Sequence, residues 1–217
     1  MSYKDNLSKI ILFDNGSYEI KHSKANMQKT YKFHNAKFFN KTNYNNISST
    51  IPFFIKDIST DLPKEQISSI GNNYQRPLSR GLLSDIDLQL DIWEKILSQH
   101  YGLNKDDDNI KQSLFMFTHI PMLPDEILGS YFEIIFEYFN FGACIKSIPH
   151  LFTSYYNKMK YNNINKTVQL VIDSGFSSTT IVPIFNNFPI YNAIKRVDIS
   201  GKLLSNYLKI VLAILLN

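Results

Sequence analysis

Cysteine, metal-ligand patterns and long apolar runs are scarce in this chain. Its single cysteine, Cys144, excludes an intramolecular disulfide and indicates a reducing compartment. The 5 histidines lack the Cys/His spacing of a zinc site. The longest apolar run, from Ile210 to Leu216, is far too short to span a bilayer, so we expect no membrane partner.

Enough apolar surface is present for a folded core. The 217 residues are 44% hydrophobic and 14% aromatic, which allows one large domain or two small ones. The net charge of +4 is mild and spread along the chain. Lysines between Lys24 and Lys41 lie in an Asn-rich stretch without clustered arginines, which is typical of a solvated surface rather than a nucleic-acid site.

Predicted strands alternate with predicted helices, which indicates an α/β fold. Ser84 and Asp87 stand in capping-box register before a helical apolar stripe, and Pro149 is placed to begin another helix. A helix from about Ser200 is predicted to pack through its leucines. Residues 25–80 are polar and aperiodic, so a loosely structured insertion is predicted there. The predicted strands are 9–13, 18–21, 114–117, 143–147, 168–172, 179–184 and 193–197.

Two Asp-containing turns carry the strongest functional signal. Phe13-Asp14-Asn15-Gly16-Ser17-Tyr18 and Ile172-Asp173-Ser174-Gly175-Phe176-Ser177 each place an Asp after an apolar strand and before a Gly turn. Two such hairpins facing each other can cradle a phosphate chain with backbone N–H groups, while the carboxylates hold a hydrated Mg²⁺. Either turn alone has the ordinary composition of a hairpin, so the prediction depends on the pair.

With these turns, four further segments give the chain a resemblance to actin and the actin-related proteins over nearly its whole length. The segments are 76–81 ahead of a helix carrying Trp93, 136–141, 182–185 and 198–204. The resemblance implies an α/β, actin-like ATPase (ribonuclease H-like) fold. Residues 1–150 would form the first lobe, with a small insertion subdomain near 37–70, and residues 151–217 the start of the second. The C-terminal part of that fold is missing, so we expect either a truncated gene model, for example from a read-through intron, or a half-protein completed by a partner.

Within the family, the details resemble the sixth class of actin-related proteins. They are Tyr18, Phe176 and the run Gly201-Lys202-Leu203-Leu204-Ser205-Asn206. Members of that class are nuclear subunits of SWR-type remodellers that exchange histone variants. The resemblance therefore implies a Snf2-type remodeller as partner, with nucleosomal histone or DNA as further contacts and no small-molecule substrate. It implies residence in the nucleus, with the cytoplasm as a second location.

The resemblance also implies a site for ATP with Mg²⁺. Asp14 and Asp173 match the carboxylates that hold the metal's water shell, and Lys21 matches the phosphate-contacting lysine. The phosphate loops correspond to Asn15, Gly16 and Ser17 in the first hairpin and to Ser174 and Gly175 in the second. From the residues alone, Lys21 is equally a solvated strand lysine, and Ser17 and Ser174 equally cap their own turns.

Three departures from actin bear on activity. Tyr18 stands where actin has its second loop glycine, and Ser177 replaces a glycine in the other loop, which weakens the cradle. Pro149 aligns with the glutamine that orients the attacking water, and proline cannot orient one. We therefore expect no hydrolysis, no catalytic residues and ATP acting as a structural ligand. An ATP-hydrolysing enzyme or sugar kinase of the superfamily, and a cytoplasmic actin-related protein of the cytoskeleton, remain the alternatives.

Overall fold

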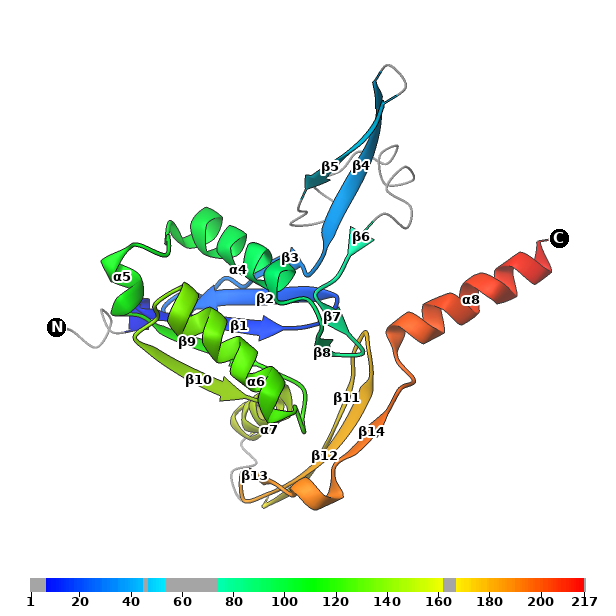
Figure 1. The fold of residues 1–217 in the computed structure, drawn as a ribbon. Coiled ribbons are helices and arrows are strands. Elements are labelled where there is room, and N and C mark those ends of the chain that lie inside the picture. Colours follow the sequence, from blue (N-terminus) through cyan, green and yellow to red (C-terminus); the bar gives the residue numbers. More distant parts are fainter. Residues whose placement is uncertain (1–6, 45–46, 54–73, 162–166, 217) are drawn as a thin grey trace.

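A five-stranded mixed sheet organises the first part of the chain. The computed structural model describes residues 7–44, 47–53, 74–161 and 167–216 (Figure 1). The strand order is β10-β9-β1-β2-β3, with β1, β9 and β10 parallel to one another and β2 antiparallel to both neighbours. The strands are β1 (Ile10–Asn15), β2 (Glu19–Lys24), β3 (Tyr31–His34), β9 (Leu114–Thr118) and β10 (Ala143–Ser147). Because parallel strands end at the same edge, the residues that follow β1, β9 and β10 are brought together there.

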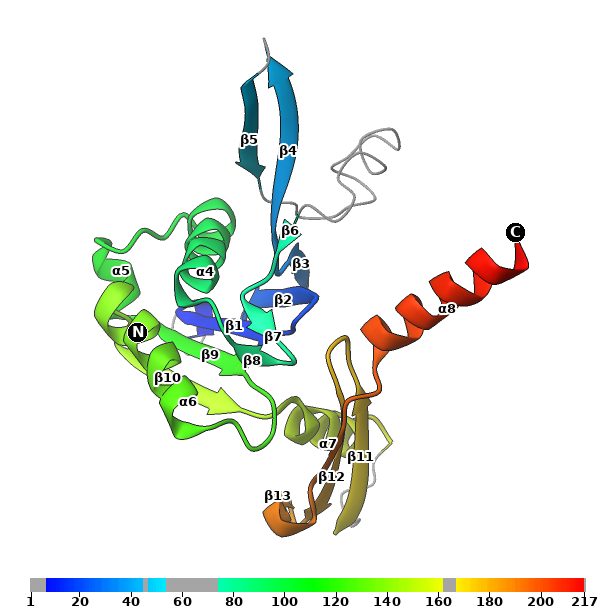
Figure 2. The same ribbon diagram turned by 45° about the vertical axis from the view of Figure 1, so that its right-hand side comes forward.

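Two helical segments cover one face of this sheet, as both ribbon views show (Figures 1 and 2). They are α4 (Ile86–Tyr101) and α6 (Asp125–Phe132), which continues as the π-helical turn η1 (Glu133–Tyr138); α5 (Asp108–Lys111) is a short turn between them. Trp93 is fully buried against Phe13 and Phe115, with ring centroids 5.8 and 5.0 Å away. The large aromatic content is therefore used for core packing between sheet and helices.

The caps of α4 correct one prediction. Asp85, not Ser84, caps the helix, because its Oδ1 accepts the backbone N–H of Leu88 at 3.0 Å. The Ser84 N–H and hydroxyl both donate to the Pro77 carbonyl, so this residue is held in the preceding segment and the helix begins one residue later. At the other end, Gly102 adopts φ of 63°, the left-handed conformation that suits glycine.

Residues 25–80 contain more structure than the sequence indicated. Strand β3 belongs to the five-stranded sheet, so the prediction of a loosely structured insertion is wrong there. A second, three-stranded sheet stands away from it (Figure 1), and a two-residue pairing follows. These strands are β4 (Lys37–Tyr44), β5 (Ile47–Phe53), β6 (Tyr74–Gln75), β7 (Leu78–Ser79) and β8 (Leu82–Leu83). Strands β4 and β5 pair in antiparallel register through their backbones, and such pairing does not require an apolar side-chain pattern. The predicted insertion subdomain at 37–70 lies partly outside the described residues.

A separate antiparallel sheet forms after residue 167. Its strands are β11 (Val168–Ser174), β12 (Thr179–Phe185), β13 (Phe188–Pro189) and β14 (Lys195–Val197), with the 3-10 turn η2 (Tyr191–Ala193) between the last two. Ala193 lies in that turn, so β14 begins two residues later than the predicted strand 193–197. Helix α7 (Pro149–Lys160) begins at Pro149 as predicted and contacts β11 and β12. The buried residues of the first hydrophobic core extend to Phe141 along the chain, and those of the second begin at Ile148. The assignment of two lobes stays a prediction.

Helix α8 (Gly201–Leu215) projects away from both sheets (Figures 1 and 2). None of its residues is buried, and Leu204 and Leu208 are 54% and 57% exposed. The prediction that this helix packs through its leucines is wrong for the described part of the chain, which presents no face to cover them. No helix among the described residues combines the length and apolarity that a membrane crossing needs.

Candidate functional site

A cavity of about 360 Å³ lies between the β1–β2 hairpin and the β11–β12 hairpin, called here the first and second hairpins. Seven of the eight predicted site residues line it, and Ser174 does not. The structure adds Thr118, His150 and Thr180 to the lining. Thr118 could have been found from its place at the end of a strand parallel to β1. The lining residues that were predicted are Asp14, Asn15, Gly16, Ser17, Lys21, Asp173 and Gly175.

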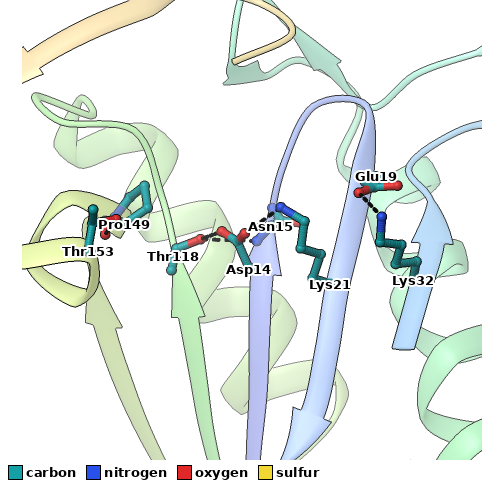
Figure 3. Close-up of polar contacts among 8 residues, drawn as sticks. All are labelled: Asp14, Asn15, Glu19, Lys21, Lys32, Thr118, Pro149 and Thr153. Atoms are coloured by element: carbon teal, nitrogen blue, oxygen red, sulfur yellow. Dashed lines mark hydrogen bonds and ion pairs between the residues drawn. The ribbon is translucent and has the colours of Figure 1, made fainter. Parts of the chain in front are cut away.

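The carboxylate of Asp14 is held from two sides (Figure 3). Thr118 Oγ1 donates to Asp14 Oδ1 at 2.7 Å, and Lys21 Nζ lies 3.5 Å from Asp14 Oδ2. Asp14 and Lys21 are register partners across the antiparallel pair, which places their side chains on one face. Lys21 therefore pairs with Asp14 while its side chain remains 48% exposed, and its role at a phosphate stays a prediction.

The Asn15 side chain is engaged by groups of the neighbouring helices. Its Oδ1 accepts the Trp93 indole N–H at 3.3 Å, and its Nδ2 donates to Tyr131 Oη at 3.3 Å and to Gln89 Oε1 at 3.4 Å. The Asn15 backbone N–H donates to Thr118 Oγ1 at 3.1 Å. Burial raises the pKa of Tyr131, so its hydroxyl stays protonated at neutral pH. This network positions the first hairpin, and the Asn15 side chain serves the turn itself.

Gly16 is required by the tightness of the first turn. A Cβ at this position would lie 2.7 Å from the backbone oxygen of Glu19, closer than a real Cβ contact. The Gly16 N–H donates to the Asp14 carbonyl at 3.0 Å, and Asn35 Nδ2 donates to the Gly16 carbonyl at 2.9 Å. The glycine therefore allows a close turn, independently of any ligand.

The second hairpin is stabilised by its own hydroxyls and by the start of α8. Ser174 Oγ lies 3.0 Å from Thr179 Oγ1, its register partner across the hairpin, so this side chain contacts the neighbouring strand of its own hairpin. The Gly175 carbonyl accepts the Gly201 N–H at 3.0 Å. The Phe176 carbonyl accepts the Lys202 N–H at 3.0 Å, so the first amides of α8 are bonded to the hairpin.

Two histidines line the cavity, and among the described residues neither is hydrogen-bonded to a carboxylate. His150 is 1% exposed, and its Nε2 lies 2.9 Å from Thr180 Oγ1. Burial lowers the pKa of His150, so its imidazole is neutral at pH 7. Burial also lowers the pKa of His119, whose Nδ1 lies 2.8 Å from the Ile120 carbonyl. The charge of Asp173 opposes the lowering of the His150 pKa by burial, but no carboxylate among the described residues is hydrogen-bonded to either ring.

Pro149 lies at the same sheet edge as Thr118 and Asp14 (Figure 3). It is the first residue of α7, where the missing N–H costs no helical hydrogen bond. The residue therefore fits its helix well and offers the cavity neither a donor nor an amide side chain.

The charges of the cavity fit part of a nucleotide–metal site. Asp14 and Asp173 both line it, which suits a hydrated Mg²⁺ held through its water shell. Over the described ranges, no three His, Cys, Asp or Glu side chains gather closely enough to ligate a metal ion directly. Outside this site, burial raises the pKa of the Cys144 thiol to about 11, so it is protonated at neutral pH.

Comparison with known proteins agrees with this architecture. The actin family, described as "Actin", matches residues 6–214. Actin-related protein 6 of Arabidopsis thaliana is 32% identical over 140 residues, covering 62% of this chain and 32% of that protein. Actin-like protein ARP6 of Kluyveromyces lactis is 27% identical over 215 residues, covering 92% and 49%. The chain spans about half the length of the relatives it matches most fully. On the family match and the mixed α/β sheet, the chain belongs to the actin family and has an actin-like fold.

Proposed function

We propose that this protein is a structural, non-hydrolysing subunit of a nuclear chromatin-remodelling complex that exchanges histone variants. Its similarity to proteins named Actin-related protein 6 supports the class. The class resemblance then supplies the complex: a Snf2-type ATPase as partner, and nucleosomal histone or DNA as further contacts. The geometry of the site supports a role without hydrolysis.

The observation that carries the proposal is Pro149 in the cavity wall. A water attacking a phosphate must be oriented by a hydrogen-bonding group within about 3 Å. Proline has neither an N–H nor a polar side chain, so it cannot orient that water.

Several polar groups of the site have partners, while the buried Nδ1 of His150 has no hydrogen-bond partner among the described residues. Asp14 is bonded to Thr118 and paired with Lys21, and His150 is bonded to Thr180. A general base must be free to accept a proton from the attacking water. The partners of Asp14 support a structural site over the alternative of an ATPase or sugar kinase, because they engage both oxygens of this carboxylate.

ATP with Mg²⁺ is proposed as a structural ligand. Asp14 and Asp173 would hold the water shell of the metal, which would neutralise the phosphate charge. Lys21 would turn from Asp14 toward the phosphates as a point charge. Bound nucleotide would then stabilise the fold in proportion to its affinity and concentration, without turnover.

Exposed aromatic residues on α7 support a role in protein contacts. Tyr155, Tyr156 and Met159 are 61–63% exposed on this helix. Aromatic residues and Met are enriched at protein interfaces relative to the rest of the surface. They suit contacts with other subunits better than direct reading of DNA bases.

The decisive experiment is mass spectrometry of the endogenous protein captured with its partners from a nuclear extract. Recovery with a Snf2-type ATPase and histone-exchange subunits is the expected result. Recovery alone, or with cytoskeletal proteins, would overturn the chromatin role and favour a cytoplasmic actin-related protein. Matched capture from a cytoplasmic extract serves as the control for location.

Absence of hydrolysis is tested separately on the purified protein. Phosphate release from ATP should equal that of an Asp14→Ala variant and of a His150→Ala variant. Turnover that falls at least tenfold in either variant would identify an active ATPase and contradict the non-enzymatic role. A protein-free blank and an Asp87→Ala variant, altered at an exposed carboxylate on α4, control for contaminating activity and for a general effect of removing charge.

A further inference from the structure

The two hairpins touch through a pair of aromatic rings. Tyr18 follows the turn of the first hairpin, Phe176 lies in the turn of the second, and their ring centroids are 5.1 Å apart at 44°. The Tyr18 ring also meets the edge of His34 at 5.1 Å. Rings at this separation and tilt attract each other beyond the area that they bury. The contact therefore joins two sheets that have separate hydrophobic cores.

Arg76 reinforces this pair from the segment between β6 and β7. Its Cζ lies 4.9 Å from the ring centroids of both Tyr18 and Phe176, and 5.0 Å from that of Tyr74. Its Nη1 donates to the carbonyls of Ser17 and Tyr18, each at 3.0 Å. A planar guanidinium can stack on rings and bond to carbonyls together, and it remains charged even though burial lowers the pKa of Arg76.

The second hairpin is fixed where it meets these groups. The Phe176 carbonyl accepts the Ser200 hydroxyl at 2.8 Å and the Lys202 N–H at 3.0 Å. Nearby, Arg196 Nη2 donates to the Arg80 carbonyl at 2.5 Å, which links β14 to the β7–β8 turn. Both sides of the ring contact are thus tied to ordered backbone.

Phe176 lines two cavities at once. One is the 360 Å³ cavity that contains Asp14 and Asp173, and the other is a cavity of about 970 Å³ between Arg76 and α8. We infer that Tyr18, Phe176 and Arg76 form a clasp that joins the two hairpins directly and holds the cleft closed without a nucleotide. In a cleft bridged only by a phosphate chain, closure would need the ligand, because the hairpins would share no other link. The clasp goes beyond the proposed function and does not depend on whether the protein belongs to a chromatin complex.

The test is the distance between the two sheets, measured by pulsed electron paramagnetic resonance on the full chain. Nitroxides are placed at Lys95→Cys on α4 and Lys195→Cys on β14, both exposed positions, in a Cys144→Ser background. We expect one narrow distance distribution without nucleotide, unchanged by saturating Mg-ATP. A broad distribution that narrows only with Mg-ATP would overturn the clasp.

Variants then assign the effect to the clasp residues. Phe176→Ala and Tyr18→Ala should each at least double the width of the distribution without nucleotide. Phe188→Ala removes a ring of the same kind that is 76% exposed on β13, and should leave the width unchanged. Arg76→Lys keeps the charge and loses the planar stack, so it should give an intermediate width.

Trp93 fluorescence shows whether each variant remains folded, because this single Trp is fully buried in the first core. Variants that keep a native Trp93 spectrum and an unchanged distance distribution would refute the clasp. If the distance distribution is broad without nucleotide but the chromatin partners are recovered, the clasp is refuted and the proposed function is not. If the distribution is narrow without nucleotide but no chromatin partners are recovered, the proposed function is refuted and the clasp is not.

Discussion

The five-stranded sheet and the later antiparallel sheet bury their apolar residues to different degrees. In the first region, 21 buried residues form one core between the sheet, α4 and α6. In the second, the core contains 5 buried residues, and Val168, Leu170 and Ile172 of β11 are 61–66% exposed. The strands themselves are comparable, since β12 alternates buried and partly buried positions much as β1 does.

The difference between the regions lies in what covers each sheet face. Two helical segments lie over one face of the first sheet, while α7 provides the helix packed against the second. A strand with an apolar residue on each face needs cover on both sides before it becomes fully buried. Among the described residues, the outer face of β11 and all sides of α8 have no such cover. Apolar sequence therefore marks where burial is possible, and packing partners decide where it occurs.

The largest effect is expected from a cavity in the first core. Phe115 is fully buried, with Phe13, Trp93 and Phe141 rings about it at 4.9–5.0 Å. Phe115→Ala should reduce the free energy of unfolding by about 3–5 kcal/mol. Urea denaturation followed by Trp93 fluorescence measures the loss. A change below about 1 kcal/mol would show that this core is not the stable part of the chain.

A matched isoleucine pair compares the two cores directly. Ile96 and Ile184 are 0% and 1% exposed, so the same side chain is removed from equal burial. Ile96→Ala should reduce the free energy of unfolding by about 4 kcal/mol. Ile184→Ala should reduce it by about 2 kcal/mol, because the smaller core can relax toward its open face. Urea denaturation followed by circular dichroism and by Trp93 fluorescence distinguishes the regions. Equal losses would contradict the proposed difference in packing.

A glycine pair tests the first turn against a helix surface. Gly16→Ala should destabilise the protein by about 1–3 kcal/mol, since the new Cβ would clash with the Glu19 carbonyl. Gly129→Ala, in α6 with nothing within 4 Å, should stabilise it by about 0.5–1 kcal/mol. Thermal denaturation measures both variants. Stabilisation by Gly16→Ala would show that the turn is looser than the structure describes.

The smallest effect is expected on α8. Leu208 is 57% exposed, so Leu208→Lys should change the free energy of unfolding by less than about 0.5 kcal/mol. The same substitution should raise solubility, because it interrupts an exposed apolar surface. Sedimentation and urea denaturation are the measurements. A large loss of stability would reveal that α8 is covered in solution.

Much of the site could be anticipated from local patterns. An Asp directly after an apolar strand and before Gly predicted both hairpins, and seven of the eight predicted residues line the cavity. Ser174 does not line the cavity, and its role at a ligand stays a prediction, because hydroxyl chemistry alone does not tell whether a side chain faces a ligand or its own hairpin. The partners of Asn15 come from α4 and α6, more than 70 residues away, so no local pattern contains them. The cap of α4 was misassigned by one residue because Pro77 competes for Ser84.

The sequence by itself determined the alternation of strands and helices, the two Asp turns and the start of a helix at Pro149. These follow from the preferences of individual residues and their spacing along the chain. Tertiary structure alone decided that Lys21 and Thr118 hold Asp14, that α8 is uncovered and that Tyr18 meets Phe176. Those contacts join residues up to about 160 positions apart, and only the packing of the two sheets brings them within interaction distance.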